Sequence, residues 1–439
     1  MRTKIVTITD SFHEIVSSLS EFLKNNQVIY VFFDQNISDF KQDYNGNIVL
    51  LGKKNSGIKI VLPEDYLSSF IGILTLGLFN GKILFTWDIK QLFSYFYFRL
   101  KRNHIIDVSS KIIDIKYGEA FLGIDGKRPD TFEDACSRAK LIARNEVLLK
   151  IHKDIHIPLA VKVLPKIETV GVADAEDRML KYPCYQIEGQ QNGRLKCVGG
   201  TLMAHNLKRE DRLKLRPKMD HKFAVFDFKS MEVYVLQWLS KDERLGKIIS
   251  SGRDIYTTLY SLLYGRKCNK ENRQLIKDSF LPIVYGMQAD SLSERLKVNL
   301  DESKELLKRI NGFFSTAMNW VQDQQNKTKE SSIVCDYFQR PRDYTDRFWA
   351  VRNAVVQGPA SIVCLEKLIS LFDKVFNYCE IVANIHDAYV LDIPCNVLYD
   401  VVYYATEVLQ APSVFMPGLK LTIDVNVGDD LENINPFRI

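Results

Sequence analysis

The sequence predicts a chain of two or three domains that mixes α-helices with β-sheet. Its 439 residues correspond to roughly two or three domains of about 150 residues each. A composition of 46% hydrophobic and 26% charged residues is ordinary for a globular protein. Runs of β-branched and aromatic residues alternate with helical periodicity along the chain. These observations exclude a disordered, collagen-like or coiled-coil protein.

The sequence predicts neither a membrane span nor secretion. Its most apolar run, residues 70–79, is shorter than the roughly 18 apolar residues that a span needs. No apolar segment with a cleavage site follows the N-terminal Arg2 and Lys4. The eight cysteines include no CxxC pair, which favours reduced thiols over disulfides or a zinc site. We therefore expect a cytoplasmic chain with no membrane partner.

The distribution of charge leaves two interpretations open. The formal net charge of +5 is too small to identify a nucleic-acid-binding protein. Residues 194–222, here called the basic segment, contain nine Lys or Arg and three Asp or Glu. This segment can neutralise phosphates, or it can be a solvated loop.

The first third of the chain alternates strands and helices. A strand at 28–33 precedes a hairpin of strands 47–51 and 58–62, and a further strand is expected at 82–86. Helices are expected at 88–100 and at 131–151, the second capped at its start by Thr131.

The remainder is predicted to begin its sheet with a strand at 222–226 that ends in Asp227 and leads into a helical pattern. Three further helices are expected, one beginning at Asp254 and two covering 271–285 and 301–325. Near the C-terminus, strands at 380–385 and 388–393 flank only His386 and Asp387, which predicts a hairpin with a polar tip.

Asp227 and Asp387 each follow a strand, so both carboxylates are expected at an edge of a sheet. Two such aspartates can hold a pair of Mg²⁺ ions that bind the attacking and leaving oxygens of a phosphoryl transfer. Taken singly, each has an ordinary alternative, because a strand-ending Asp is often a helix N-cap and a His-Asp pair is often only a turn.

The predicted 271–285 helix places Arg273, Lys277, Leu281 and Tyr285 on one face, at successive spacings of four residues. Two cations and an aromatic ring on one face can bind a triphosphate and stack on a base. The alternative is an amphipathic surface helix, which the spacing alone favours.

Together these motifs resemble the bacterial DNA polymerase I family, family A. The resemblance rests on Asp227-Phe-Lys-Ser-Met-Glu232, Arg273-x3-Lys277-x7-Tyr285-Gly286 and Ile385-His386-Asp387. It is supported by Asn192-Gly-Arg-Leu195, Asn353-x3-Gln357-Gly358 and residues 417–425, and it runs in order from about residue 190 to the C-terminus.

The resemblance implies a right-hand polymerase palm and fingers, and it implies a role for each matching residue. Asp227, Asp387 and the Phe228 carbonyl would hold two Mg²⁺ ions, which Mn²⁺ could replace. The nucleotide-binding residues would be Arg273, Lys277, Leu281, Tyr285 and Glu232, with Lys277 also catalytic. The DNA-binding residues would be Arg194, Asn353, Gln357 and His386.

Glu232 would crowd the sugar 2′ position and so favour deoxynucleotides over the ribonucleotides that single-subunit RNA polymerases use. The chain departs from the family at Ala388, where the family has Glu, and at Leu281, where it has an aromatic residue. Next to Leu281, Pro282 replaces a family glycine. A proline inside a helix removes one backbone hydrogen bond. Trp349 occupies the place of a family arginine, for which Arg347 or Arg352 could substitute.

The N-terminal third resembles the family's ribonuclease H-like 3′-to-5′ proofreading domain more faintly. Asp34, Asn36, Asp88 and Asp134 occupy the positions of its acidic residues. Asn36 replaces a Glu, and a neutral amide is a poorer ligand for a hard cation than a carboxylate. We expect a retained fold whose exonuclease activity is weak or lost.

The expected domains are an exonuclease-like domain at 1–150 and a polymerase domain at 151–439. Within the latter, the palm with a minimal thumb covers 151–240 and 340–439, and the fingers cover about 241–339. Only 59 residues separate Asp134 from Arg194, where the family inserts a long helical thumb. A reduced thumb predicts fast, salt-sensitive dissociation from DNA unless a processivity or replisome partner compensates.

The leading hypothesis is a template-directed DNA polymerase that binds primer-template DNA and deoxynucleoside triphosphates. A catalytically inactive scaffold or DNA-binding replisome component, and an enzyme similar to single-subunit RNA polymerases, are the alternatives. The abundance of Lys, Asn, Ile, Phe and Tyr fits an AT-rich genome of bacterial, phage or plasmid origin.

Overall fold

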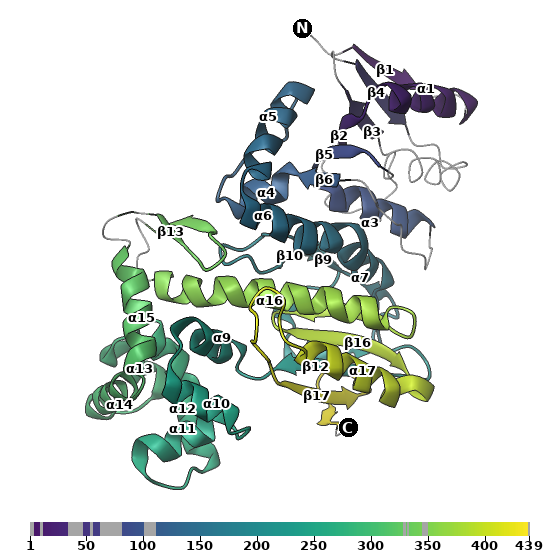
Figure 1. Cartoon of the computed structure of the whole chain (residues 1–439). Helices are drawn as coiled ribbons and strands as arrows, with labels where there is room; N and C mark the ends of the chain where they lie inside the picture. Colours follow the sequence, from purple (N-terminus) through teal and green to yellow (C-terminus); the bar gives the residue numbers. More distant parts are fainter. Residues whose placement is uncertain are drawn as a thin grey trace. The chain divides into compact units, whose positions relative to one another are not determined.

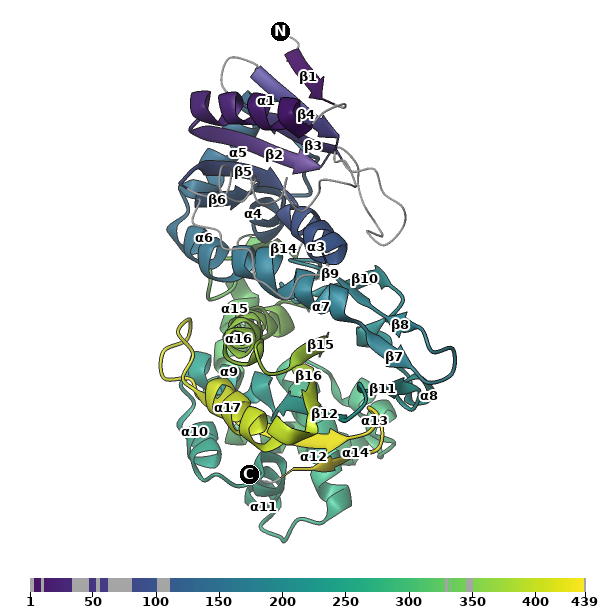
Figure 2. The ribbon, with the colours of Figure 1, turned by 90° about the vertical axis from the view of Figure 1, so that its right-hand side faces the viewer.

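The computed structural model describes residues 4–8, 12–33, 47–52, 56–61, 81–100, 111–327, 331, 333–344 and 350–437. The chain divides into two compact units. The first unit comprises Met1–Asp227, Leu365–Leu409 and Asp424–Ile439, and the second unit comprises Phe228–Cys364 and Gln410–Ile423. Figures 1 and 2 show the elements of each unit from two directions. The domain boundary expected at residue 150 stays a prediction.

A six-stranded mixed sheet forms the N-terminal part of the first unit. Its order is β1 (Lys4–Ile8), β4 (Ser56–Val61), β3 (Asn47–Leu51), β2 (Val28–Phe33), β5 (Ile83–Trp87) and β6 (Lys111–Asp114). Strands β2, β3 and β4 are antiparallel neighbours, whereas β5 and β6 continue the sheet parallel to β2. Helix α1 (Phe12–Asn25) lies beside β4 in both views, and α3 (Ile89–Leu100) follows β5 (Figures 1 and 2). The predicted strands and the hairpin are confirmed.

The single helix predicted at 131–151 is wrong, because the structure has two helices there. Helix α5 (Phe132–Ala143) begins where predicted, and the Thr131 hydroxyl accepts a hydrogen bond from the Asp134 backbone nitrogen at 3.1 Å. Helix α6 (Glu146–Ile151) starts anew at Asn145, whose side chain accepts from the Leu148 nitrogen at 2.9 Å. An N-cap residue has non-helical backbone angles, so Asn145 ends the continuity that the apolar periodicity suggested.

Helix α6 continues through two π-helical turns, η2 (His152–His156) and η3 (Leu159–Val163), into α7 (Leu164–Val170). Short elements then follow: β7 (Val172–Asp174), β8 (Leu180–Lys181), β9 (Pro183–Gln186), β10 (Lys196–Gly200), η4 (Ala204–Asn206), α8 (Arg209–Arg212) and β11 (Leu215–Arg216). Between Asp134 and Arg194, the connection in which the thumb was expected to be short, the structure has the rest of α5, then α6, η2, η3 and α7, and the short strands β7, β8 and β9.

A five-stranded sheet carries the predicted aspartates. Its order is β15 (Glu380–Ile385), β16 (Ala388–Pro394), β12 (His221–Phe228), β17 (Ile423–Gly428) and β18 (Ile434–Pro436). Helix α17 (Leu398–Gln410), reached through η7 (Cys395–Val397), lies along this sheet in both views (Figures 1 and 2). Phe223, Phe226 and Tyr389 are fully buried in it. The predicted strand before Asp227 and the two-residue hairpin are confirmed.

Most of the second unit is helical. It contains α9 (Met231–Ser240), α10 (Glu243–Ser250), α11 (Ile255–Tyr264), α12 (Lys270–Val284), α13 (Ala289–Leu296), α14 (Leu300–Phe313), α15 (Ser315–Asn326) and the hairpin of β13 (Ile333–Cys335) and β14 (Pro341–Asp343). Asp254 caps α11 as predicted, accepting a hydrogen bond from the Thr257 nitrogen at 2.8 Å. The single helix predicted at 301–325 is wrong, because Phe314 leaves the helical conformation at φ −108°, ψ 44° and is fully buried.

Helix α12 contains Pro282 near its C-terminal end without breaking. A proline cannot donate to the carbonyl four residues earlier, which here is that of Asp278. The Arg295 side chain on α13 supplies the missing donor, since its Nε lies 3.3 Å from the Asp278 oxygen. The departure from the family at this position is therefore compensated by a neighbouring helix.

The longest described helix, α16 (Val351–Val375), was not predicted from the sequence as a helix. It is the one helix among the described residues that is long and apolar enough to cross a membrane, judged by length and composition alone. However, 89% of its most apolar window is buried inside the structure. The core helix of a globular protein passes the same test, so this is weak evidence for a membrane span.

Candidate active site

The two predicted aspartates lie at the same end of neighbouring strands. Strands β12 and β16 are antiparallel, and Asp227 is the register partner of Ala388. Asp387 directly precedes Ala388 in the two-residue turn after β15. Register partners in antiparallel strands have Cα atoms roughly 5 Å apart, so the Asp227 and Asp387 backbones are close neighbours.

Asp227 does not cap the helix that follows it, which removes the ordinary alternative for this residue. The N-cap of α9 is Ser230, in a left-handed conformation at φ 51° and without a capping side-chain hydrogen bond. Asp227 is an exposed residue at the end of β12. Asp227 is therefore accessible to solvent at the end of a central strand of the sheet.

The oxygen donors at this end of the strands fit a magnesium ion that keeps substrate and water ligands. Mg²⁺ is usually held by one or two carboxylates, with phosphates and waters completing its octahedron. Asp227 and Asp387 supply two carboxylates, and the backbone carbonyl of Phe228 adjoins the first. In the described part of the chain, no three His, Cys, Asp or Glu side chains group together as a metal site. Ala388, which stands where the family has Glu, adds no carboxylate to this pair.

A histidine that the sequence analysis missed packs against the turn. The rings of His205, in η4, and His386 are stacked with their centroids 4.7 Å apart and their planes at 24°. Burial, followed by the proximity of His386, lowers the pKa of His205 to about 4, so His205 is neutral at neutral pH. No motif contains His205, so only its place in the fold identifies it.

Arg194 stands in a tight turn that fixes its backbone. Gly193 adopts φ 77°, and the Asn192 side-chain oxygen accepts a hydrogen bond from the Arg194 nitrogen at 3.1 Å. A positive φ favours glycine at this position. Asn192 and Gly193 therefore shape the turn that presents Arg194, whose guanidinium was expected to contact DNA.

Glu232, Tyr285 and Gln357 form a cluster within the second unit, although the sequence suggested separate roles for them. The Tyr285 hydroxyl donates a short hydrogen bond to Glu232 Oε2. Gln357 Nε2 donates to Glu232 Oε1 at 3.0 Å. Glu232, expected at the sugar, is therefore held in place by Tyr285, expected at the base, and by Gln357, expected at the DNA.

The predicted nucleotide-binding face of α12 is turned away from the core. Arg273, Lys277, Leu281 and Tyr285 are half-buried or exposed, with Lys277 the exposed residue. The buried residues of the helix lie on its other side: Ile276, Ser279, Phe280, Ile283 and Val284. Arg273, Lys277 and Leu281 thus lie on the accessible side of the helix, and Tyr285 is its C-cap residue. That this side binds a nucleotide stays a prediction.

Arg273 has a partner that the sequence analysis used only as a helix cap. Its Nε and Nη2 atoms donate to the Asp254 carboxylate at 3.0 and 2.7 Å. Burial raises the pKa of Asp254, but the hydrogen bonds from Arg273 and Thr257 outweigh it and leave the pKa below its usual value. The carboxylate therefore stays ionised and orients the guanidinium.

Asn353 and Gln357 lie one turn apart on α16, both half-buried. Of the two candidate replacements for the family arginine, Arg347 lies outside the described residues. Arg352 donates from Nε to Gln325 Oε1 at 2.8 Å and also binds Gln322. Arg352 is thus anchored to α15.

The exonuclease remnant is described only in part, because Asp34 and Asn36 lie outside the described residues. Asp88 is buried, accepts a hydrogen bond from the Tyr117 hydroxyl at 2.6 Å and forms an ion pair with Lys116. Asp134 is half-exposed in the first turn of α5, with its carboxylate 3.5 Å from Arg138. The Lys116 ammonium thus balances the charge of the Asp88 carboxylate.

Much of the basic segment is already paired with carboxylates of the first unit. The pairs are Arg209 with Glu432, Lys214 with Glu176, Arg216 with Asp430, Lys218 with Glu380 and Lys222 with Asp429. Exposed ion pairs are worth little and exchange readily. The pairing favours the solvated-surface interpretation for these residues.

The sheet that carries Asp227 and Asp387 and the helix that carries Arg273 and Lys277 both lie inside a region that matches a known family. The family described as "DNA polymerase family A" matches residues 188–433. That match covers more than half of the chain, so the chain belongs to DNA polymerase family A. Use of divalent metal ions is general in this family.

Individual relatives agree with this assignment. The thermostable DNA polymerase I of Thermus aquaticus is 26% identical over 222 residues, which cover 47% of this chain and 26% of that protein. DNA polymerase I of Helicobacter pylori is 25% identical over 179 residues, covering 38% and 20% respectively. The chain thus spans about a quarter or less of the length of these curated relatives.

A solved structure shares the fold. The POL domain of Pol1 from M. smegmatis, in complex with a DNA primer-template and dNTP, superposes with a TM-score of 0.77. The superposition covers 98% of this chain and 100% of that one, at 14% sequence identity. At this identity the similarity establishes the fold alone.

Proposed function

We propose that this protein is a template-directed DNA polymerase that adds deoxynucleotides to a primer 3′ end by two-metal phosphoryl transfer. The observation that carries the proposal is the pair Asp227 and Asp387 at neighbouring strand ends, inside the region that matches the family. A primer-extension assay with Mg²⁺, run separately with deoxynucleotides and ribonucleotides, tests it directly.

Each residue has a chemical task in this reaction. Asp227 and Asp387, with the Phe228 carbonyl, would hold two Mg²⁺ ions or their Mn²⁺ substitutes. Those ions, when bound, activate the primer hydroxyl and balance the charge of the leaving pyrophosphate. Lys277 and Arg273 bind the triphosphate, and their positive charge stabilises its transition state. The Asp254 carboxylate keeps the Arg273 guanidinium oriented for this contact.

The primer-template is the second substrate. Arg194, Asn353, Gln357 and His386 are assigned to it, because the minor-groove acceptors of every correct pair allow geometry to be checked without reading sequence. Tyr285 and Leu281 would border the nascent pair. That the similar M. smegmatis domain is bound to primer-template and dNTP supports these substrates for this chain.

An inactive scaffold is less well supported than an enzyme. A scaffold has no use for the paired aspartates, the exposed Lys277 or the hydrogen-bonded Glu232. An RNA-synthesising enzyme is disfavoured because Glu232 is held in place by Tyr285 and Gln357. A processivity or replisome partner and a cytoplasmic location remain part of the proposal.

Kinetic measurements should distinguish the residue that contacts the triphosphate from the residue that contacts the primer-template. Lys277→Ala is expected to lower catalysis by about a hundredfold through the triphosphate, whereas Arg194→Ala should act on the primer-template dependence. Lys247→Ala, which removes an exposed lysine of α10, is the matched control and should change neither. The assigned roles are wrong if the rates of both variants show the same dependence on nucleotide concentration and a normal dependence on DNA concentration.

The isolated chain is expected to be distributive and to lack effective proofreading. The short connection before Arg194 offers few phosphate contacts, so product length in the presence of a DNA trap should fall steeply from low to physiological salt. A mismatched 3′ end should persist for two reasons. Lys116 forms an ion pair with the Asp88 carboxylate, and Asn36 replaces an acidic ligand. Long products under trap without a partner protein, or rapid Mg²⁺-dependent mismatch removal that Asp34→Ala abolishes, would contradict this prediction.

A further inference from the structure

The turn that carries Asp387 is held by residues that lie outside the motifs matched to the polymerase family. His386, its first residue, has a positive φ of 59°. Such a backbone conformation is strained for a residue with a Cβ atom and persists where the surroundings over-determine it. The surroundings here begin with Asn384, which is 4% exposed and whose Nδ2 donates to the His386 oxygen at 3.2 Å and to the Ala388 oxygen at 3.4 Å.

Asn384 is in turn fixed by a tyrosine. Strand β15 is at the edge of its sheet, where outward backbone groups have no strand partner. The Tyr185 hydroxyl, from β9, donates to the Asn384 oxygen at 2.8 Å and accepts from the Asn384 nitrogen at 2.9 Å. One fully buried hydroxyl thus satisfies both edge groups of the residue that braces the turn.

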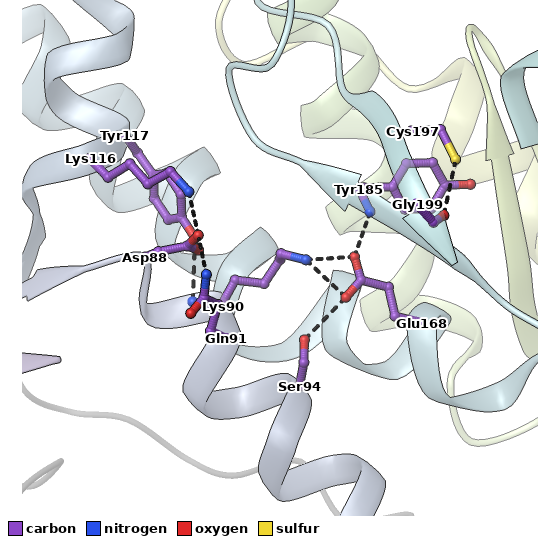
Figure 3. A network of polar contacts seen from close by, with 10 residues as sticks. All are labelled: Asp88, Lys90, Gln91, Ser94, Lys116, Tyr117, Glu168, Tyr185, Cys197 and Gly199. Carbon is purple, nitrogen blue, oxygen red and sulfur yellow. Dashed lines mark hydrogen bonds and ion pairs between the residues drawn. The ribbon is translucent and has the colours of Figure 1, made fainter. Parts of the chain in front are cut away.

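Glu168 fixes the backbone of Tyr185. This carboxylate on α7 is fully buried and accepts from the Tyr185 nitrogen at 2.7 Å. Its charge is balanced by Lys90 Nζ, at 2.7 and 2.9 Å from the two oxygens, and Ser94 donates to it at 3.1 Å. Figure 3 shows the side chains of Lys90 and Ser94, from one helix, and the backbone nitrogen of Tyr185 meeting at this carboxylate. Lys90 and Ser94 belong to α3, in the segment that resembles an exonuclease.

We propose that Tyr185, anchored by Glu168 and the α3 residues Lys90 and Ser94, is the positioning residue for the metal-binding turn of the polymerase site. The inference rests on the proposed function. It also gives the retained exonuclease-like segment a task in the polymerase reaction, because that segment supplies the counter-ion of the buried carboxylate. Outer contacts of this kind set metal affinity by fixing where a ligand points.

The test is Tyr185→Phe in the full chain, which deletes the hydroxyl and keeps the ring. The half-saturating Mg²⁺ concentration for primer extension should rise about three- to tenfold, with the rate at saturating Mg²⁺ within about twofold. The matched control is Tyr30→Phe, since Tyr30 is equally buried in the same unit and its hydroxyl donates to the Pro129 oxygen at 3.0 Å, which is not part of this network. That variant should leave the Mg²⁺ requirement unchanged.

Two measurements do not depend on polymerase activity. Amide hydrogen exchange at residues 384–389 should accelerate by about tenfold in Tyr185→Phe and not in Tyr30→Phe. Mn²⁺ binding, followed by electron paramagnetic resonance, should likewise weaken in Tyr185→Phe and not in Tyr30→Phe. If Tyr185→Phe does not fold, Asn384→Ala keeps the backbone bonds to Tyr185 and should give the same shifts.

The outcomes distinguish this inference from the proposed function. Absence of extension by the unaltered chain would refute the proposed function, while the exchange and Mn²⁺ data would still decide the role of Tyr185. Equal changes in the two tyrosine variants, or an unchanged Mg²⁺ requirement together with unchanged exchange at the turn, would overturn the inference.

Discussion

Replacing Asp387 with alanine is expected to reduce primer extension at least about a thousandfold, because a bound metal supplies several kcal/mol of charge stabilisation and about 4 kcal/mol corresponds to that factor. Asp387 lies in a two-residue turn at the sheet edge and is not part of the buried core. The loss should therefore appear in activity and not in the thermal unfolding temperature. Asp227→Ala should behave in the same way.

The control for this experiment is Asp400→Ala. Asp400 is an exposed aspartate on α17 in the same unit, and its removal should leave extension within about twofold. Comparing extension rates at saturating Mg²⁺ and DNA, with unfolding temperatures measured in parallel, separates loss of metal ligation from loss of fold. Robust extension by Asp387→Ala would refute the metal assignment.

Replacing Glu232 with alanine is expected to relax the preference for deoxynucleotides over ribonucleotides by about a hundredfold, since a steric barrier is removed. The structure adds a second consequence. The Tyr285 hydroxyl and the Gln357 amide both donate to this carboxylate, so the alanine variant also frees two side chains that the reaction uses. The KM for deoxynucleotides should therefore rise as well.

Two further variants separate these effects. Glu232→Gln keeps the size of the side chain and should preserve discrimination. Tyr285→Phe removes one hydrogen bond while leaving the carboxylate, and should change KM more than discrimination. The measurement is the ratio of kcat/KM for each ribonucleotide and its deoxy counterpart. An unchanged ratio in Glu232→Ala would mean that this carboxylate does not face the sugar.

Local sequence was sufficient where the structure depends on neighbouring residues. Thr131 and Asp254 cap helices as predicted, because an N-cap hydrogen bond joins residues three positions apart. The hairpin around His386 and Asp387 is likewise a local feature. By contrast, apolar periodicity continued through Asn145 and Phe314, where the helices in fact end. The Asn145 cap was readable from the sequence, whereas no local pattern marks the break at Phe314, whose side chain is fully buried.

The amino-acid sequence by itself determined the family, the strand that ends at Asp227 and the shared face of Arg273 and Lys277, because these follow from short motifs and regular spacing. Only the tertiary structure decided that Glu232 binds Gln357, 125 residues away, and that Tyr185 braces Asn384, 199 residues away. Such contacts arise when packing brings distant segments together and buries their polar groups, which must then find partners. No local pattern encodes which partner that will be.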